Sequence, residues 1–499
     1  MVFHSPILSY LQELKPDHEI CVSKGSRLLA GSLVERSLNL AQGFVNAGMK
    51  RGDVVLFAVA PGIEFLETFV ALIHVRAKVA LVDPHMGSQL YASKIEQLKP
   101  QWAFIDSRLL LIQNSSLFTW LYQKLAPGGL FIPKSNAYKV FKTGYKMPWV
   151  KGVNLPYNHS FTGNLADGDA DDEIVIVYTS GSLAEPKGVV QSIHSIHSSL
   201  LVIGDLLKNA PGKRMVSHLP HFALIGMFVD YQVLFWDEKL SASAKLKFIE
   251  KHQIDTIFAP PSEVLELMDW CQQNGSTFPE SLQHIILGSA PILNPFLKEL
   301  RKFYFNKATC FYGMTENVLI ATIDADLKLK LNRKEDVLGK PHGQLEYKIA
   351  KDGELFIQTD WLYKRYFHQK SRSHFHATGD LVELNEEGYL LMKGRKKNMI
   401  IRKHKNIYPG LYEPTICAIP GVKDACMLGM YNNEKHDEEV ILLVDQEGDL
   451  TDIKLMSMLT SGMHAIDSDA LPDKVVFGAI PRFGRQNKID YQKLKAASY

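Results

Sequence analysis

The stretch Tyr178–Val190, YTSGSLAEPKGVV, places hydroxyl side chains, two glycines and one lysine between two apolar runs. Small hydroxyl residues and glycine expose backbone N–H groups, which a bound anion requires. Lys187 would add a positive point charge. A Walker A loop needs a glycine directly before this lysine and a serine or threonine after it, whereas the chain has Pro186 and Gly188 there. Two interpretations remain open: a phosphate-binding loop of another kind, and a polar turn made of residue types that are common in turns.

A strand before this stretch and a helix after it would hold the loop in place. Glu173–Tyr178, EIVIVY, predicts a buried strand, and a helical pattern begins at about Ser192. The same alternation recurs along the chain, and further strands are predicted at Asp53–Ala60, Val79–Val82, Trp102–Ile105, Arg214–Leu219 and Thr256–Ala259. It predicts an α/β fold in which parallel sheets are covered by helices. Gly128–Asn154 follows neither pattern and is predicted to be a long surface connection near the substrate entrance.

A second region begins near Gly394–Lys405, GRKKNMIIRKHK, where seven of twelve residues are basic when His404 is counted. About a hundred residues follow, which is enough for a small separate domain. They carry predicted strands and one predicted helix, at Ala425–Met430, Glu439–Val444, Val475–Ala479 and Leu450–Ser461. We therefore expect a large N-terminal domain, residues 1–393, and a small mobile C-terminal α/β lid domain, residues 394–499.

The composition argues against several classes of protein. The 56 Lys and Arg residues nearly balance the 54 Asp and Glu residues, and a nucleic-acid-binding protein normally has a strong basic excess. No apolar run approaches the roughly 18 residues of a transmembrane helix, and the first residues do not form a signal-peptide pattern. The five cysteines are odd in number and have no CxxC spacing, which argues against a disulfide framework or a zinc site. We expect a cytoplasmic protein.

Five short motifs resemble, in order and in spacing, those of the adenylate-forming (AMP-binding) superfamily, which includes acyl-CoA and aryl-CoA synthetases. Each motif is short, but together they extend over nearly the whole chain. They are the loop from Thr179 to Gly188, the YGxTE-like Tyr312–Glu316, the TGD of Thr378–Asp380, the hinge-like Gly394-Arg395 with Lys397, and Lys488-Ile489 near the C-terminus.

The resemblance implies that ATP and Mg²⁺ take part and that a carboxylate attacks the α-phosphorus of ATP while pyrophosphate leaves. Both reactants are anions, so the protein must neutralise charge on the transferring group and on the leaving group. The residues implied to hold the β- and γ-phosphates are Thr179, Ser180, Gly181, Ser182 and Lys187. The residues implied to be catalytic are Thr315, which would bond the α-phosphate, Glu316, which would also hold Mg²⁺, and Lys488, which would bridge the carboxylate and the α-phosphate.

The resemblance also implies where the nucleoside would lie. Tyr312 would lie against the adenine, with Gly288, Ser289, Ala290 and Pro291 on the other side, and Gly313 is implied to bind ATP as well. Asp380 would accept hydrogen bonds from the ribose hydroxyls, with Arg395 assisting. Lys397 would be the hinge about which the lid turns between two reaction steps.

Three departures from the pattern of this superfamily concern the phosphate loop and the second step. Leu183 and Ala184 stand where relatives have threonine and glycine, so the loop loses a hydroxyl and some backbone freedom. Ala223 stands where many thioester-forming relatives have histidine. Lys403 and His404 lie near the place where a glycine lets the pantetheine arm pass.

A closely related group, the β-lactone synthetases of olefin biosynthesis, is partly similar to this chain. VALVDPHMG, PHFALIGMF and PRFGRQNKID resemble stretches of those enzymes, whereas NIYPGLYEP does not. Such enzymes close a 2-alkyl-3-hydroxy acid through its acyl adenylate and need no thiol. An apolar acyl pocket is expected in either case, and the candidates for its lining are Phe222, Ile225, Gly226, Phe228 and the Leu287–Ala290 region, which includes Gly288.

We therefore expect an ATP-dependent ligase that activates a carboxylic acid, in our interpretation a fatty acid, and transfers it to a thiol acceptor, CoA or a carrier protein. No aspartate is placed to bind an amino-acid amine, so an aliphatic acid fits better than an amino acid. The two alternatives are a β-lactone synthetase on the same fold and a nucleotide-binding scaffold that has lost turnover. Only Leu183 and Ala184 favour the scaffold, because Asp380, Glu316 and Lys488 are retained.

Overall fold

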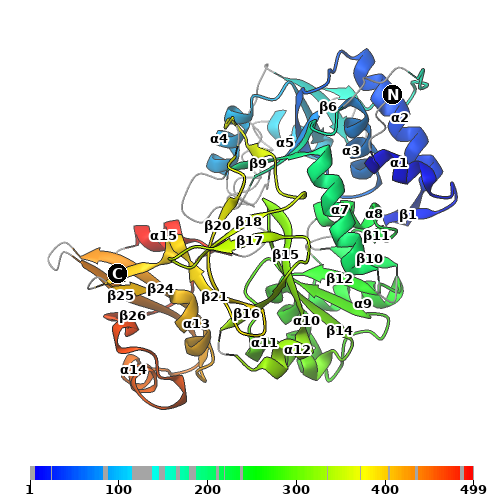
Figure 1. Ribbon diagram of the computed structural model, residues 1–499. Coiled ribbons are helices and arrows are strands. Elements are labelled where there is room, and N and C mark those ends of the chain that lie inside the picture. The colour runs from blue at the N-terminus through cyan, green and yellow to red at the C-terminus, as the bar shows by residue number, and fades with distance from the viewer. Residues whose placement is uncertain are drawn as a thin grey trace.

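The computed structural model describes residues 6–23, 25–82, 88–114, 138–144, 152–163, 169–178, 187–208, 213–217, 220–236, 240–333, 335–370, 372–402, 405–432, 437–483 and 488–497 of the 499-residue chain. These residues form two large sheets, of eight and thirteen strands, and three small sheets near the C-terminus. Figure 1 shows the orange and red C-terminal part to one side of the larger blue, green and yellow part. None of the helices described is long and apolar enough to cross a membrane.

The eight-stranded sheet is built mainly from the N-terminal part of the chain, in the order β19-β9-β8-β4-β3-β5-β6-β7. Its strands are β3 (Val54–Ala58), β4 (Lys78–Leu81), β5 (Trp102–Asp106), β6 (Lys139–Thr143), β7 (Val153–Asn154), β8 (Glu173–Tyr178), β9 (Gly188–Ser192) and β19 (Arg365–Tyr366). The helices of this part are α2 (Ala30–Asn46), α3 (Ile63–Val75), α4 (Ser88–Leu98) and α5 (Ser107–Asn114). Phe44 of α2 packs against Phe104 and Phe141 at ring-centroid distances of 5.1 and 5.2 Å, so this helix buries its apolar face on the sheet.

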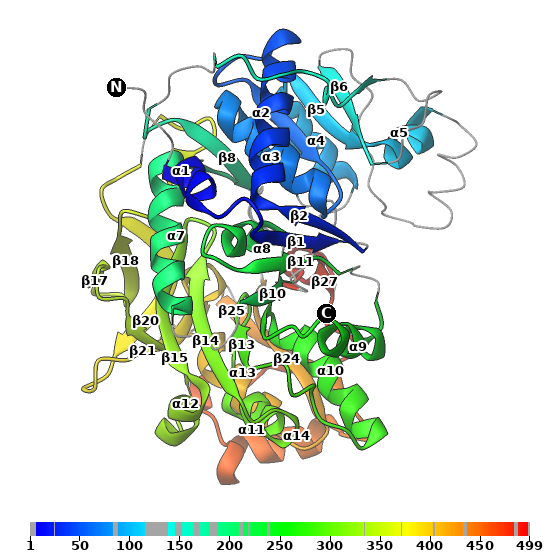
Figure 2. The same ribbon diagram turned by 90° about the vertical axis from the view of Figure 1, so that its right-hand side faces the viewer.

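The thirteen-stranded sheet has the order β17-β18-β20-β21-β16-β15-β14-β13-β12-β10-β11-β1-β2. Its strands are β1 (Glu19–Ser23), β2 (Ser26–Leu29), β10 (Arg214–Ser217), β11 (Gln232–Leu234), β12 (Thr256–Ala259), β13 (His284–Leu287), β14 (Lys307–Met314), β15 (Asn317–Asp324), β16 (Asp336–Pro341), β17 (Glu346–Ile349), β18 (Glu354–Gln358), β20 (His376–Leu384) and β21 (Leu390–Arg395). Its helices are α1 (Pro6–Glu13), α7 (Ile193–Leu207), α8 (Pro220–Met227), α9 (Ala242–Lys251), α10 (Pro261–Asn274), α11 (Asn294–Phe303) and α12 (Ala325–Leu331). Figure 2 shows α7 running from one large sheet to the other, and it contacts β9 of the first and β15 of the second.

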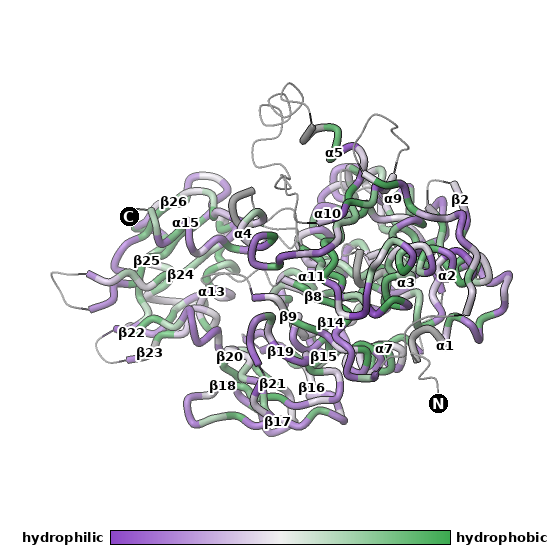
Figure 3. The backbone as a smooth tube through the Cα atoms, turned by 90° about the horizontal axis from the view of Figure 1, so that it is seen from above, coloured by the Kyte–Doolittle hydropathy of each residue, from purple (hydrophilic) through white to green (hydrophobic). Residues whose placement is uncertain are grey.

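The C-terminal part has its own sheets and its own apolar core. Its elements are η2 (Lys396–Asn398), β22 (Ile400–Arg402), β23 (Lys405–Ile407), α13 (Pro409–Cys417), β24 (Val422–Asn432), β25 (Asp437–Gln446), α14 (Asp452–Thr460), η3 (Gly462–His464), η4 (Ser468–Ala470), β26 (Lys474–Phe477), β27 (Arg482–Phe483), β28 (Lys488–Ile489) and α15 (Tyr491–Ala496). Buried Ile416, Met427, Leu442 and Leu455 belong to this core. Figure 3 shows these elements to one side of the larger part when the molecule is viewed from above.

The α/β class is confirmed, but the prediction that the large sheets are parallel is wrong, because both are mixed. From β14 to β17 every neighbouring pair of the thirteen-stranded sheet is antiparallel. Only Thr315 and Glu316 separate β14 from β15, and a connection this short can join only antiparallel strands, since a parallel pair needs a long crossover.

Strands also occur where the sequence predicted a loop. β6 and β7 lie inside the stretch Gly128–Asn154, which was expected to be a surface connection, although most of that stretch lies outside the described residues. β6 pairs with β5, and its Phe141 stacks on Trp102 at 5.7 Å, so burial of this aromatic pair explains the strand. β9 was not expected either, and it forms an antiparallel hairpin with β8 directly before α7.

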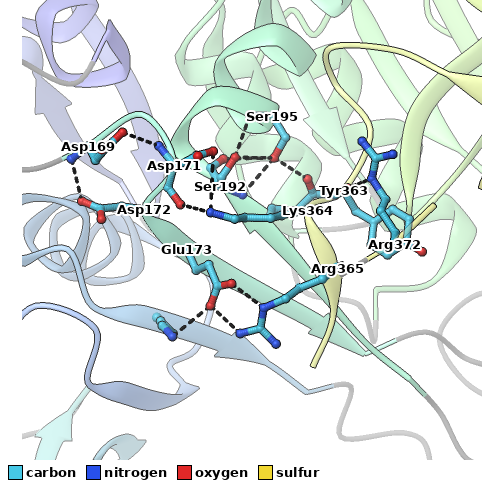
Figure 4. A network of polar contacts seen from close by, with 12 residues as sticks. Asp169, Asp171, Asp172, Glu173, Ser192, Ser195, Tyr363, Lys364, Arg365 and Arg372 are labelled. Atoms are coloured by element: carbon cyan, nitrogen blue, oxygen red, sulfur yellow. Dashed lines mark hydrogen bonds and ion pairs between the residues drawn. The ribbon is translucent and has the colours of Figure 1, made fainter. Parts of the chain in front are cut away.

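One segment joins the two large sheets. After β18 the chain leaves the thirteen-stranded sheet and forms β19 on the edge of the other sheet, where Arg365 pairs with Val190. Figure 4 shows how polar contacts fix this crossing. The Arg365 guanidinium donates to both carboxylate oxygens of Glu173, at 2.5 and 2.7 Å, and Lys364 Nζ donates to the carbonyl oxygen of Asp171 at 2.6 Å.

Candidate active site

A cavity of about 2190 Å³ is lined by both large sheets and by the C-terminal part. The eight-stranded sheet contributes Phe57 of β3 to this lining, the thirteen-stranded sheet contributes Phe311 of β14, and the C-terminal part contributes Lys488 of β28. Its lining includes both charged and apolar regions, which come from different elements. A concave site where several parts of the chain meet is a usual location for a ligand.

The hairpin of β14 and β15 brings the YGMTE residues to this cavity. Pairing shifts register between Tyr312 and Met314, and a Cβ on the intervening Gly313 would overlap the carbonyl oxygen of Val318. Glycine is therefore required for the close approach of the two strands. The backbone of the turn is held from outside, because Gln191 Nε2 donates to the carbonyl oxygen of Thr315 at 3.1 Å. Tyr312, Gly313, Thr315 and Glu316 all line the cavity.

Asp380 lies directly behind this lining, between two partners. The Tyr312 hydroxyl donates to its Oδ2 at 2.6 Å, and Nε of Arg395 lies 2.8 Å from its Oδ1. Asp380 and Arg395 are register partners on β20 and β21, which explains their pairing. Asp380 is only 1% exposed and does not itself line the cavity, whereas Arg395 does. Burial and the nearby carboxylate raise the pKa of Tyr312, so its hydroxyl stays protonated and donates. Direct contact of Asp380 with a ribose stays a prediction.

The predicted lysine of the C-terminal part lies among other cations. The pKa of Lys488 is lowered to about 8, mainly by burial and further by the positive charges of Arg395 and Lys397. Burial and Arg395 lower the pKa of Lys397 to about 8 as well. Within the part of the chain that the structure describes, neither lysine forms an ion pair. Three cations thus line one cavity, and an anionic ligand would relieve their mutual repulsion.

The predicted phosphate loop, Thr179 to Gly188, lies only partly within the described residues. Thr179, Ser180, Gly181 and Ser182, with Leu183 and Ala184, lie outside the described residues. Lys187 is described and lines the cavity, and its Nζ lies 4.8 Å from the centre of the Tyr366 ring. The Tyr366 hydroxyl donates to Oε1 of Glu316 at 2.8 Å. Sequence reasoning missed Tyr366 and Gln191, because neither belongs to a recognised motif.

The residues expected beside adenine follow strand β13. Ser289, Ala290 and Pro291 line the cavity. Ser289 has a φ of 68°, a left-handed conformation that is uncommon for residues other than glycine. Gly288 does not line the cavity itself, and a Cβ there would lie 3.2 Å from the ring of Phe258 and 3.4 Å from the carbonyl oxygen of Phe311. The absence of a side chain at Gly288 thus lets this loop lie against β12 and β14.

The apolar region of the cavity lies where the two large sheets meet. Phe57 of β3 packs on Phe65 of α3 at 5.2 Å, and Phe65 packs on Phe235, which follows β11, at 6.2 Å. Among the described residues of β3, α3, α8, β11, α9 and α10, and of the loops that follow these elements, no charged side chain lines the cavity. Ile225 and Phe228 line the cavity as expected.

For two residues predicted to line the acyl pocket, Gly226 and Phe222, the structure does not confirm the prediction. Gly226 does not line the cavity, because it is buried and faces Met215 and Val233 of the sheet, where a Cβ would overlap the Met215 sulfur. Its helix α8 therefore needs glycine for packing rather than for the pocket. The side chain of Phe222 lies outside the described residues.

The residues present fit a magnesium ion that arrives with its nucleotide. Mg²⁺ is usually held by one or two carboxylates together with substrate phosphates and water. Glu316 supplies one carboxylate at the cavity, and its Oε2 has no hydrogen-bond partner among the described residues. Those residues include no group of three or more His, Cys, Asp or Glu side chains suited to hold a metal ion by themselves.

The model of the family described as AMP-binding enzyme matches residues 11–367. The chain belongs to this family. The superfamily membership expected from the five motifs is thereby confirmed. The partial resemblance to β-lactone synthetases receives no support from the relatives reported below.

Two curated AMP-binding relatives show the range of acids. The 2-succinylbenzoate–CoA ligase of Bacillus velezensis is 30% identical over 281 residues, 52% of this chain and 56% of that protein. A long-chain-fatty-acid–CoA ligase of Mycobacterium tuberculosis is 25% identical over 342 residues, 62% of this chain and 65% of that protein. The chain thus spans little more than half of the length of the first relative and about two thirds of the length of the second.

Solved structures agree with the fold over nearly the whole chain. The o-succinylbenzoate CoA synthetase of Bacillus subtilis, in complex with its acyl-adenylate intermediate, has a TM-score of 0.79 at 20% identity and covers 99% of this chain and 98% of that chain. MatB of Rhodopseudomonas palustris, bound to ATP, has a TM-score of 0.79 at 20% identity and covers 99% of each chain. The fold of this AMP-binding enzyme is therefore that of adenylate-forming proteins.

Proposed function

We propose that this protein is an ATP-dependent acid–thiol ligase that activates a carboxylic acid as its acyl adenylate and then transfers the acyl group to a thiol such as that of CoA. The proposal rests on one observation above all. Lys488 from the C-terminal part lines the same cavity as Thr315, Glu316 and Arg395 of the large part. A cation next to a carboxylate and a hydroxyl is what transfer between two anionic substrates requires.

In the first step a carboxylate oxygen of the acid bonds to the α-phosphorus of ATP. The bond from that phosphorus to the bridging oxygen breaks, and pyrophosphate leaves with the electron pair. Lys488 would stabilise the charge that develops on the α-phosphoryl group, and the Thr315 hydroxyl would donate to one of its oxygens. Glu316 would hold Mg²⁺, which neutralises phosphate charge when it is bound.

In the second step a thiolate sulfur bonds to the acyl carbon, the bond from that carbon to the phosphate oxygen breaks, and AMP leaves. We propose that the C-terminal part, which begins at η2, turns about Lys397 between the two steps, so that Lys488 withdraws after the first. The end of β21 at Arg395, followed by the short η2 and by sheets that are not part of the large one, supports a boundary here.

We propose a long apolar acyl group as the substrate class. The aromatic lining from Phe57, Phe65 and Phe235 offers apolar contact, and no charged side chain among the described residues of this region lines the cavity. A second carboxylate, such as that of 2-succinylbenzoate, would be buried there without a partner, which is costly. The apolar lining therefore favours a fatty acid over a dicarboxylic acid.

A panel of acids tests the proposal. Pyrophosphate release is measured with ATP, Mg²⁺ and one acid at a time: palmitate, octanoate, 2-succinylbenzoate and malonate. We expect acid-dependent release that is fastest with a fatty acid, and formation of the acyl thioester when CoA is added. Release with a dicarboxylic acid alone would overturn the substrate class. No release with any acid would favour the scaffold alternative, and product formation from a 3-hydroxy fatty acid without CoA would favour the β-lactone alternative.

A further inference from the structure

Tyr366 contacts two residues of the proposed site that come from different sheets. Its hydroxyl donates to Oε1 of Glu316 at 2.8 Å, on the β14–β15 turn of the thirteen-stranded sheet. Its ring lies 4.8 Å from Nζ of Lys187, which directly precedes β9 of the eight-stranded sheet. Tyr366 also lines the cavity beside both residues. One side chain thus connects the carboxylate proposed for Mg²⁺ and the lysine proposed for the β- and γ-phosphates.

The backbone around Tyr366 is fixed on both sides. Tyr366 is the register partner of Val189, and the amides on either side of β19 donate to β9, Lys364 N to Val190 O at 2.9 Å and Phe367 N to Gly188 O at 2.7 Å. The ion pair of Arg365 with Glu173, which also involves Lys78 at 2.9 Å, holds the same strand (Figure 4). A side chain anchored in this way can act as a rigid reference for its neighbours.

The segment that carries Tyr366 also holds the Glu316 backbone. The amide of Tyr363 donates to the carbonyl oxygen of Glu316 at 2.8 Å, and the Tyr363 ring packs on Tyr366 at 4.8 Å. Glu316 is therefore held at its backbone and at one carboxylate oxygen by the same segment. Its other oxygen, Oε2, has no hydrogen bond within the described ranges and is left for a ligand.

The ring of Tyr366 also separates opposite charges. Lys187 and Glu316 form no ion pair with each other in the described structure, although both contact the same tyrosine. A lysine that rests on an aromatic face is attracted to that face and is not bound to a carboxylate, so it can meet an anion. A direct ion pair would instead neutralise both groups before the nucleotide arrives. Burial and the Glu316 carboxylate raise the pKa of the Tyr366 hydroxyl, so it remains a donor.

We propose that Tyr366 is a positioning residue for the metal–triphosphate part of the site: its hydroxyl orients Glu316 toward Mg²⁺, and its ring keeps Lys187 available for phosphate. This inference rests on the proposed function for the identity of the nucleotide and the metal. It adds a residue that the recognised motifs do not contain. It also gives the β19 crossing a role beyond joining the two sheets.

Two substitutions separate the two roles. Tyr366→Phe removes the hydroxyl and keeps the ring, whereas Tyr366→Leu removes both. Tyr157→Phe is the matched control, because the Tyr157 hydroxyl also donates to a buried glutamate, Glu67, at 2.8 Å, and neither residue lines the cavity. ATP binding is measured by calorimetry with Mg²⁺ and again with EDTA, and Mn²⁺ binding to the ATP complex is followed by electron paramagnetic resonance. These readouts do not require turnover.

For Tyr366→Phe we expect affinity for ATP to fall about tenfold with Mg²⁺ and to stay unchanged with EDTA, since partners that orient a metal ligand typically matter about 10- to 100-fold. The Mn²⁺ spectrum of the ATP complex should change as well. For Tyr366→Leu we expect a further loss of about two- to fivefold that appears in EDTA too, because Lys187 then loses its aromatic support. Tyr157→Phe should leave both affinities as in the wild type.

The inference would be overturned if Tyr366→Phe lost affinity for ATP equally with and without Mg²⁺, or if its affinity for ATP did not fall at all. The same holds if Tyr157→Phe shows the Mg²⁺-dependent loss, because loss of a hydroxyl outside the cavity would then have the same effect. Failure of the proposed function is seen separately. A wild-type protein that binds Mg²⁺ and ATP but releases no pyrophosphate with any acid contradicts the ligase proposal, while the binding data still decide the role of Tyr366.

Discussion

At the scale of single residues, the site concentrates positive charge that the described protein does not neutralise. Lys488, Lys397 and Arg395 line one cavity, and only Arg395 is paired, with Asp380. Such an arrangement opposes its own folding slightly and favours an anionic ligand, because Arg395 and Lys397 add to the effect of burial in lowering the pKa of Lys488.

Lys488→Ala should reduce adenylation about 10²- to 10³-fold, by analogy with the loss of one charge-stabilising donor in a transition state. ATP affinity should change little, because the lysine is proposed to act mainly as the new bond forms. Acid-dependent ATP–pyrophosphate exchange and calorimetric ATP binding are the two measurements. Lys493→Ala is the control, since Lys493 lies on α15 of the same part and pairs with Asp490 at 3.5 Å. Exchange within threefold of the wild type would contradict the assignment of Lys488.

The pH dependence gives a second test. The pKa of Lys488 is lowered to about 8, so in the free enzyme this lysine loses its proton as the pH rises through about 8. We expect kcat/KM for ATP to fall above that pH, since this parameter reports groups of the free enzyme. Lys397→Gln removes a positive neighbour, which should raise the pKa of Lys488 and move the decline to higher pH.

Lys396→Gln is the matched control for the pH experiment. Lys396 precedes Lys397 directly, but its Nζ pairs with Asp352 and Glu354, each at 2.7 Å, and it does not line the large cavity. The decline should therefore stay at the wild-type pH. A decline that is unmoved in Lys397→Gln, or that vanishes in it, would show that Lys488 is not the titrating group.

At the scale of elements, the β14–β15 hairpin positions the YGMTE residues, and Gly313 is its most constrained point. Gly313→Ala should destabilise the protein by about 1–3 kcal/mol, because a Cβ there overlaps the carbonyl oxygen of Val318 and the strands must separate. Chemical denaturation measures this loss, and pyrophosphate exchange should fall because Tyr312 and Thr315 move with the strand. Gly343→Ala is the control, since a Cβ at Gly343 meets nothing within 4 Å. Equal stability of the two variants would contradict this account of the hairpin.

The helices and strands also show how much of the fold could be predicted from the sequence. Local patterns predicted β3, β4, β5 and the start of α7 close to their observed positions, because hydrophobic periodicity is a local property. The motifs predicted Tyr312, Thr315, Glu316, Arg395 and Lys488, which the structure brings to one cavity. Gln191 and Tyr366 were missed, since they reach Thr315 and Glu316 from 124 and 50 residues away along the chain. The antiparallel half of the large sheet was missed for a similar reason, because strand pairing is decided by contacts between distant segments.

At the scale of the whole molecule, helix α13 of the C-terminal part contacts the last strand of the large sheet, β21. Helix α13 lies against β21 at two glycines, and a Cβ on Gly410 would lie 3.1 Å from the Cα of Gly394. The C-terminal part has its own apolar core, so the proposed turn of this part as a unit would leave that core buried. Lys397 lies in η2, between the last strand of the large sheet and the first strand of the C-terminal part.

If the two parts turn about this point, Lys397→Pro should separate the two half-reactions. Proline fixes φ near −65°, which is compatible with the 3₁₀ helix η2 and so with the arrangement described, in which Lys488 lines the cavity. Adenylation should therefore continue, reduced somewhat because proline also disfavours helical geometry at Lys396, whereas thioester formation, which needs the turn, should be lost. Lys397→Ala is the control, because it removes the same charge from the cavity and leaves φ free. Pyrophosphate exchange and transfer from preformed acyl adenylate to CoA measure the steps separately. If the proline variant loses both steps equally, or if Lys397→Ala loses thioester formation to the same extent, the lid does not turn at this residue.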